Sequence, residues 1–572
     1  MWSFYVVVQT CVTLLTALLL RYYASPNTPL AVYCSTGLAW LTSFSIIALV
    51  PIDVWATMSE QDNEIIGVLW DISYWITFLL TWLFIPIHQG YVDAGDFSVS
   101  GRLRTSIRDN LIFWLIMVVV GITGIMLLIF AAHFSLSDLP RYGISLSNAF
   151  GLLVSVFLLG YGLVAIPKLL WRQASPEKSF AAGISRLGRL AEKMDDASFE
   201  LNTVVTAVQA TYQQMTRRDP LRKHMEVIYT YAQDESPILP RTVAGRNGLV
   251  DLESISVDDL DYGVSVKSMA QLRRRLQRAI SVYRGVRSQY CSKVIQVIEL
   301  DEICKSRRSG DYHPCQQHSK LSWSYKCTIR PFVYRAFSIL LALLSVCVIF
   351  AEATIGAGRS PDLSPFSVMV HHEQNQGEMS LQILVLFPLI YLCACTYYSL
   401  FQLGIFRSYY FMVPRCTSAF SLLVNAALMC RFAPPLCYNF LHIIHVDDPN
   451  DGNDQATTFA RKMAAMDVIP ALGVRFNTWF PVVMSVYCTC VAFSGMTKQC
   501  KNFTVILPGR LIFDHEVWYS FASVQSLFQS RHTRNRTCMS LYPTLNMEHM
   551  FTCESMSVPT IADSLLAAVR TV

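Results

Sequence analysis

The sequence predicts an all-α protein: a polytopic membrane helix bundle with about nine transmembrane helices and a cytoplasmic antiparallel coiled-coil hairpin. Three observations favour this fold class. First, 53% of the 572 residues are hydrophobic and only 15% are charged, which is too apolar for an ordinary soluble protein of this length. Second, apolar runs long enough to cross a bilayer recur along the chain. Third, the one long polar stretch between these runs has heptad periodicity.

The predicted spans are apolar runs of about 20 residues, the length that a helix needs to cross a hydrocarbon core of roughly 30 Å. The first run starts close to Met1 without the positive segment of a signal peptide, so we interpret it as a span and not as a leader. The runs are Ser3–Arg21, Leu30–Pro51, Ile65–Ile87, Asn110–Ala132, Ile144–Leu170, Phe332–Ala353, Ser380–Phe406, Cys416–Val446 and Val468–Phe493.

Lysine and arginine at the span ends predict the orientation, because positively charged flanks stay in the cytoplasm. Basic flanks such as Arg102–Arg108 and Lys168–Arg172 alternate with acidic ones such as Glu60–Glu64. We therefore expect an extracellular or lumenal N-terminus and a cytoplasmic C-terminus, in the plasma membrane or an endomembrane. The predicted organisation is spans one to five in residues 1–170, a cytoplasmic coiled-coil loop in 171–327, spans six to nine in 328–493 and a cytoplasmic tail in 494–572.

Two helical arms with apolar residues spaced alternately three and four apart occupy the 171–327 loop, and this spacing is typical of a coiled coil. The first arm ends at Asp219–Pro220, a helix stop, and a polar connector leads to the second, so we expect an antiparallel hairpin. The two apolar faces either pack against each other or bind a receptor or trafficking partner. The predicted partner face is formed by Leu187, Met194, Leu201, Val208, Leu272, Leu276, Tyr283 and Val286.

Arginine is concentrated on the second arm, at positions 273, 274, 275, 278, 284 and 287. We interpret these side chains as a solvated face of the arm. The alternative is that they contact anionic lipid headgroups, if the arm folds back onto the membrane.

Motifs for nucleotide binding, hydrolysis and zinc proteolysis are missing from the sequence: it contains no G-x-x-x-x-G-K-[ST], G-x-S-x-G or H-E-x-x-H. The net charge of +5 is spread along the chain, which argues against a nucleic-acid partner. We expect no enzyme, no cofactor and no metal site, with membrane lipid as a partner. One group of metal-ligand residue types has a spacing that fits no familiar zinc site: Cys304, His313, Cys315, His318 and Cys327.

Arg431 lies near the middle of the eighth apolar run, where an uncompensated charge costs about 2.5 to 3.5 kcal/mol. Pro434 and Pro435 cannot donate backbone hydrogen bonds, so we expect the helix to bend and leave carbonyl groups free. Arg431 would satisfy those carbonyls or pair with Glu352 or Asp71. The group is interpreted as a structural staple between helices, with a polar cavity for a ligand or lipid and an ion path as alternatives. The candidate intramembrane polar site is Arg431, Pro434, Pro435, Asn439 and Glu352.

Seven short segments carry a resemblance to a known family, and they occur in order within roughly Leu49 to Phe493. They are Leu49–Asp53, Tyr74–Trp82, Leu159–Val164, Ile166–Lys168, Pro220–Lys223, Arg330–Tyr334 and Cys430–Leu441. On these segments the sequence resembles the limb-region-1-like family of membrane proteins, also called the lipocalin-interacting membrane receptor family. It is most similar to the limb-region domain-containing protein 2 branch.

The resemblance implies nine spans, an external N-terminus and a large cytoplasmic loop with coiled coil. It also implies a non-enzymatic role, because family members are described as receptors or as accessory proteins in receptor signalling and trafficking. It supplies no binding residues to transfer. The leading hypothesis is therefore a receptor-like or scaffold protein that recruits partners through the coiled coil. The alternative is a transporter or lipid-handling protein that uses a polar cavity around Arg431.

Overall fold

The structure is a computed structural model that describes residues 2–60, 64–132, 139–238, 262, 265–310, 320–355, 362–373, 377–403, 412–446, 457–463, 483 and 486–491. Helices make up the regular structure of these residues. The one β-type pairing found among them is an isolated parallel bridge between Ala24 and Thr417. The predicted all-α polytopic bundle is confirmed.

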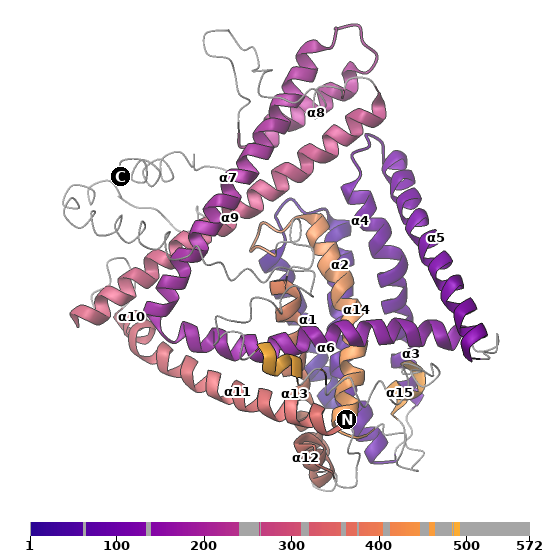
Figure 1. Cartoon of the computed structure of the whole chain (residues 1–572), viewed down its shortest axis with the longest axis vertical. Coiled ribbons are helices and arrows are strands. Elements are labelled where there is room, and N and C mark those ends of the chain that lie inside the picture. Colours follow the sequence, from indigo (N-terminus) through magenta and orange to yellow (C-terminus); the bar gives the residue numbers. More distant parts are fainter. Residues whose placement is uncertain are drawn as a thin grey trace. The chain divides into compact units, whose positions relative to one another are not determined.

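Eight helices of the described chain are long and apolar enough to cross a membrane, and Figure 1 labels them along the chain. The third crosses as α3, a π-helical turn and α4 in succession. The predicted ninth span, residues 468–493, lies outside the described residues except at 483 and 486–491. The elements are α1 (Trp2–Tyr23), α2 (Leu30–Met58), α3 (Glu64–Leu79), η1 (Leu80–Phe84), α4 (Ile85–Asp93), α5 (Val99–Ala132), α6 (Leu139–Gln173), α11 (Arg330–Thr354), α13 (Glu378–Leu403) and α14 (Ala419–Ile443).

Two helices of the bundle continue through prolines. Helix α2 passes through Pro51, where the second span was expected to end, and continues to Met58. Helix α14 likewise runs without interruption through Pro434 and Pro435. Each proline removes one backbone hydrogen bond, so tertiary packing must hold these helices together at the proline positions.

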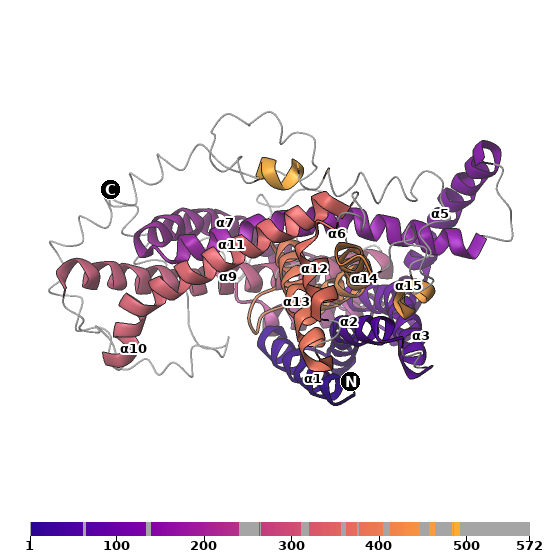
Figure 2. The ribbon, with the colours of Figure 1, turned by 90° about the horizontal axis from the view of Figure 1, so that it is seen from below.

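The chain divides into two compact units, which are described separately. Unit 1 comprises Met1–Trp171, Ala197–Gly285 and Phe332–Gly509, and unit 2 comprises Arg172–Asp196, Val286–Pro331 and Arg510–Val572. In unit 1, α1, α13 and α14 all pack on α2, and Figure 2 shows these helices from below. Close packing takes the place of the hydrophobic effect between helices in lipid.

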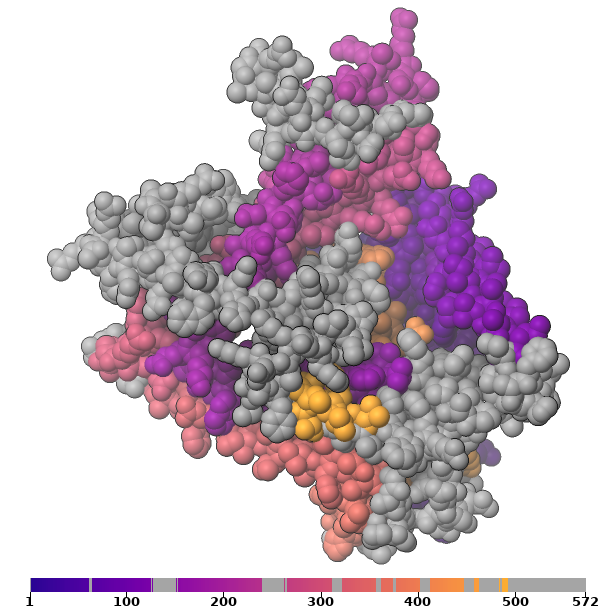
Figure 3. All heavy atoms as spheres, in the orientation of Figure 1, coloured from indigo at the N-terminus to yellow at the C-terminus, as the bar shows by residue number. Residues whose placement is uncertain are grey.

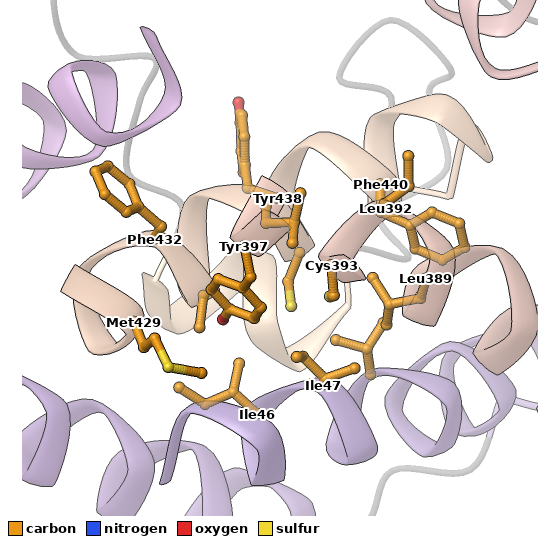
Figure 4. Close-up of a cluster of buried hydrophobic side chains, with 14 of the residues drawn as sticks. Ile46, Ile47, Leu389, Leu392, Cys393, Tyr397, Met429, Phe432, Tyr438 and Phe440 are labelled. Atoms are coloured by element: carbon orange, nitrogen blue, oxygen red, sulfur yellow. The ribbon is translucent and has the colours of Figure 1, made fainter. Parts of the chain in front are cut away.

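The core of unit 1 is built where α2, α13 and α14 meet. Figure 4 shows Ile46 and Ile47 of α2 facing Tyr397 of α13 and Met429 of α14, all of them buried. A small residue permits close approach of α6 to α13, because a Cβ on Gly162 would lie 2.2 Å from the carbonyl oxygen of Cys395. This pattern is typical of helix contacts in membranes.

Between α6 and α11 lie the long polar helices α7 (Pro176–Gln214), α8 (Arg222–Glu235) and α9 (Val266–Ser309). Within unit 1, Glu200 of α7 pairs with Arg275 of α9 at 3.0 Å. Within unit 2, a Cβ on Gly183 of α7 would lie 2.9 Å from the side chain of Val297 of α9. Helices therefore form where the heptad pattern predicted two arms. Their packing as a coiled-coil hairpin stays a prediction.

Candidate functional site

The candidate intramembrane polar site contains one buried pair. Asn439 of α14 donates a hydrogen bond from Nδ2 to Oε1 of Glu352 on α11. Glu352 is 1% exposed and Asn439 is 7% exposed, and the second carboxylate oxygen, Oε2, has no hydrogen-bond partner among the described residues. This contact joins two spans that are distant in sequence, and it leaves one buried acceptor atom unused.

Arg431 contacts a different element, the π-helical turn η1. Its guanidinium carbon lies 5.2 Å from the ring centroid of Trp82 in the π-helical turn, a cation–π contact. Pro435 faces α6, because a Cβ on Gly151 would lie 2.6 Å from its Cγ. The structure thus distributes the predicted site over three contacts of α14, with α11, η1 and α6. The bend expected at Pro434 does not interrupt the helix.

The residues of the predicted coiled-coil partner face are turned inward. Six of the eight are buried: Leu201, Val208, Leu272, Leu276, Tyr283 and Val286. Leu187 and Met194 are half-buried. Such burial is what packing within the chain requires at these six positions.

Asp93, at the end of α4, binds two arginines of α9 at once. Its Oδ2 accepts a hydrogen bond from Arg274 Nε at 2.8 Å and its Oδ1 accepts one from Arg278 Nε at 2.8 Å. Each guanidinium group makes a second contact with Oδ2. The carboxylate is only 8% exposed, and bidentate, charge-assisted pairs are the strong class of hydrogen bond. We call this group of three residues, all in unit 1, the Asp93 clamp.

The loop after Asp93 contacts α9 through its backbone as well. A Cβ on Gly95 would lie 1.9 Å from the carbonyl oxygen of Ala270, so the approach requires glycine. The carbonyl oxygen of Asp96 accepts hydrogen bonds from Arg273 of α9 at 3.0 Å and from Arg102 of α5 at 2.9 Å. The α4–α5 loop is therefore fixed to α9 on one side and to α5 on the other.

Phe97 completes this junction as an aromatic platform. The guanidinium carbon of Arg273 lies 5.3 Å from its ring centroid, and the ring of His224 on α8 lies 4.5 Å from it. Burial lowers the pKa of Arg273, and the nearby charge of Arg102 lowers it further. An arginine nevertheless stays protonated in proteins, so the junction keeps its positive charge.

Two further arginines of α9 pair with carboxylates. Arg275 binds Glu200 at 3.0 Å, and Arg284 binds Glu235 at 2.7 Å. These two arginines and the two of the Asp93 clamp are ion-paired and also partly solvated, because their side chains are 32 to 43% exposed. Their partners lie 49 to 185 residues away in the sequence, so no local pattern could have indicated them.

Asp53 is a functional candidate that sequence reasoning missed, although it lies in one of the segments that carried the family resemblance. It is 1% exposed within α2. Its carboxylate accepts hydrogen bonds from Trp70 Nε1 at 3.0 Å, from the Thr458 N–H at 3.1 Å and from the Phe459 N–H at 2.8 Å. Asp53 thereby joins α2 and α3 to the start of the short helix α15 (Thr458–Met463). The sequence signal that could have identified it is an acidic residue that directly follows an apolar run ending in Pro51 and Ile52.

His445 is a second residue that the sequence did not single out. Its φ of 51° is left-handed, and the Val446 N–H donates to the Leu441 carbonyl at 3.4 Å, which is the helix-ending turn that usually has glycine at this position. The imidazole is 2% exposed and its Nδ1 lies 3.3 Å from Oδ1 of Asp362. Oδ2 of Asp362 accepts a hydrogen bond from Ser367 at 2.6 Å. His445 therefore has a left-handed backbone, which is unfavourable for a residue with a side chain, and a buried side-chain contact with Asp362.

None of these groups has the composition of a metal centre. No set of three or more His, Cys, Asp or Glu side chains among the described residues could hold a metal ion. Three of the metal-ligand residue types noted in the sequence, at 313, 315 and 318, lie outside the described residues. The arrangement of the described site is suited to holding helices and a loop in place.

Comparisons with known proteins identify a family of membrane proteins and several relatives. The family model described as LMBR1-like membrane protein matches residues 1–496. A Xenopus laevis protein described as G-protein coupled receptor-associated protein LMBRD2 is 27% identical, over 77% of this chain and 63% of its own length. The Homo sapiens protein of the same description is 26% identical, over 82% of this chain and 75% of its own length.

A third relative, from Drosophila melanogaster, is described as LMBR1 domain-containing protein 2 homolog and is 25% identical, over 83% of this chain and 75% of its own length. The chain therefore spans between 63% and 75% of the length of these relatives. No solved structure matches it.

Proposed function

Because the chain belongs to the LMBR1-like membrane protein family, which matches it over residues 1–496, we propose that it is a non-enzymatic accessory protein of a membrane receptor. The family recognised from the sequence is confirmed, and the chain is an integral membrane protein. Two relatives are described as G-protein coupled receptor-associated, which supports a receptor of that class as the partner. The role we propose is a scaffold in receptor signalling and membrane trafficking.

The Asp93 clamp is the observation that carries this proposal. A scaffold must present its binding surface in a fixed orientation to the membrane, because a mobile surface loses conformational entropy on binding. The clamp and the backbone contact of Gly95 fix the first part of α9 to the end of the third span. The part of the polar loop that belongs to unit 1 is thereby fixed to the bundle by side-chain and backbone contacts.

The outward faces of the polar helices are the surface that we propose for the receptor. The predicted partner residues of the heptad seams are mostly buried and serve to position the helices. Large apolar side chains point outward instead at Phe199 of α7, which is 59% exposed, and at Val227 of α8, which is 48% exposed. With the loop and the C-terminus in the cytoplasm, as the basic flanks predict, this surface would meet the cytoplasmic side of the receptor.

The transporter or lipid-handling alternative has less support. Arg431 contacts Trp82, and Glu352 contacts Asn439, so each polar group of the predicted cavity joins α14 to another helix. We propose that these contacts are structural staples.

Co-purification of a G-protein coupled receptor with the full chain from native membranes tests the scaffold proposal. Asp93→Arg should reduce receptor recovery severalfold, because three cationic groups would then face one another. Combining Asp93→Arg with Arg274→Asp and Arg278→Asp should restore recovery, since the charges are exchanged. Asp109→Asn, at an exposed carboxylate on α5, is the matched control and should leave recovery unchanged. If Asp93→Arg inserts normally and recovers as much receptor as the natural chain, the scaffold proposal is wrong.

A further inference from the structure

Helix α5 is the span that the rest of the described chain covers least. None of its most apolar 18-residue window is buried, whereas 72% of the corresponding windows of α2 and α14 is buried. Its contact with α4 lies near its start, where Asn110 Nδ2 donates to the Pro86 carbonyl at 3.1 Å. Figure 3 shows violet side chains of this part of the chain at the surface. A face of this kind must be covered by lipid or protein in a membrane.

The first half of α5 carries a shallow groove of about 610 Å³. Its lining changes character along the helix. The end nearest the Asp93 clamp is mixed, with Ser100, Arg104 and Arg108 set among the apolar side chains Leu103 and Ile107. Toward the middle of the span only apolar residues line it, namely Leu111, Ile112 and Leu115. At a rise of about 1.5 Å per residue, the apolar part begins within one turn of the second arginine. The groove therefore has a cationic end, which suits an anionic headgroup, and an apolar end, which suits an acyl chain.

Arg104 and Arg108 of the groove differ from the arginines of α9 in their ion pairs. The α9 arginines discussed above bind Asp93, Glu200 and Glu235. Arg104 and Arg108 are both exposed, and no salt bridge found among the described residues includes either. They stand four residues apart on one face of the helix, where like charges repel. An anion held between them would relieve this repulsion.

We propose that the α5 groove binds an anionic phospholipid. The phosphate lies between the guanidinium groups of Arg104 and Arg108, which suit phosphate oxygens because they offer several N–H donors in a planar fork. The hydroxyl of Ser100, one turn earlier, provides a further donor. One acyl chain follows Ile107, Leu111 and Leu115. This proposal does not depend on the proposed receptor partner. Its ligand binds a surface that follows the Asp93 clamp in the chain.

Lipid binding to the full chain in detergent, measured by native mass spectrometry, tests the proposal. Phosphatidylserine, phosphatidylcholine and soluble phosphoserine serve as probes. The double variant Arg104→Gln, Arg108→Gln should bind phosphatidylserine weaker by on the order of tenfold, since each arginine near a membrane surface contributes to the attraction of anionic lipid. The matched control is Arg21→Gln, Arg335→Gln, two exposed arginines at the ends of α1 and α11.

The expected result is preferential binding of phosphatidylserine over phosphatidylcholine, lost in the double variant and retained in the control. Leu111→Asn should also weaken binding, because the acyl chain loses an apolar contact. A double variant that binds like the natural chain overturns the site, as does an equal loss in the control. Soluble phosphoserine that binds as tightly as the lipid overturns the role of the apolar groove. The thermal midpoint of each variant confirms that the protein remains folded.

Discussion

The carboxylate of Glu352 accepts a hydrogen bond from the side-chain amide of Asn439, and the two residues connect α11 to α14 inside the bundle. We predict that Glu352→Ala lowers the free energy of unfolding by about 1 to 3 kcal/mol, because the amide of Asn439 is left buried without its acceptor. Glu352→Gln should lose much less stability than Glu352→Ala, since the glutamine amide oxygen also accepts a hydrogen bond. Denaturant titration in detergent measures both. Equal losses in the two variants would exclude the hydrogen bond as the cause.

Gly95→Ala should separate the α4–α5 loop from α9. The added methyl group has no room, because it would lie 1.9 Å from the Ala270 carbonyl oxygen. We expect increased hydrogen exchange in the first turns of α9, at residues 266–278. Gly285→Ala is the control on the same helix, where a Cβ meets nothing within 4 Å. That change should stabilise α9 by up to about 1 kcal/mol, the helix preference for alanine over glycine.

His445→Gly and His445→Ala separate two opposing effects at the end of α14. Glycine removes the cost of the left-handed backbone, about 1 kcal/mol, but also removes the contact with Asp362. Alanine keeps the backbone cost and loses the same contact. We therefore predict that the alanine variant is less stable than the glycine variant by about 1 kcal/mol, as measured by thermal unfolding. If the two variants unfold at the same temperature, the backbone at this position is not strained.

Lys293 of α9 has a shifted pKa that predicts a pH dependence of stability. Burial lowers its pKa below the ordinary 10.5, and the charge of Arg186 lowers it further. The unfolded chain then binds more protons than the folded chain between the lowered and the ordinary pKa, so stability rises with pH across that window. Lys293→Met should stabilise the chain at pH 7 by about 1 kcal/mol, with a gain that shrinks as the pH approaches 10.5.

The control for this prediction is Lys305→Met. Lys305 is 59% exposed and pairs with Asp301, so its replacement should give no stabilisation that depends on pH. Thermal unfolding of the full chain between pH 7 and pH 10 compares the two variants. A gain from Lys293→Met that is constant over this range would show that burial does not disfavour the charged amine.

The sequence predicted the spans well because crossing a bilayer is a local property of about 20 residues. Eight of the predicted spans correspond to helices of the described chain. The ends of the spans were predicted less well. The second span was expected to stop at Pro51, but α2 continues to Met58, since Asp53 finds partners on α3 and α15 that make a buried carboxylate tolerable.

The candidate site was less predictable, because its contacts join residues that are far apart in the chain. Heptad spacing identified Leu276 as a seam residue, and it is buried. The same periodicity left Arg274 and Arg278 on the opposite side and gave them no partner. Their partner, Asp93, closes the third span, 181 and 185 residues earlier. A single sequence has no record of such pairings.

Asp53 has a consequence for the order in which the protein is made. Trp70 emerges from the ribosome shortly after it, but the backbone donors of Thr458 come 405 residues later. Until then the membrane must hold a second span with an aspartate that has one of its three partners. We expect the early spans to remain in contact with the insertion machinery, or with water, until Thr458 and Phe459 have been translated. Chains that stop before residue 457 should be degraded as incomplete.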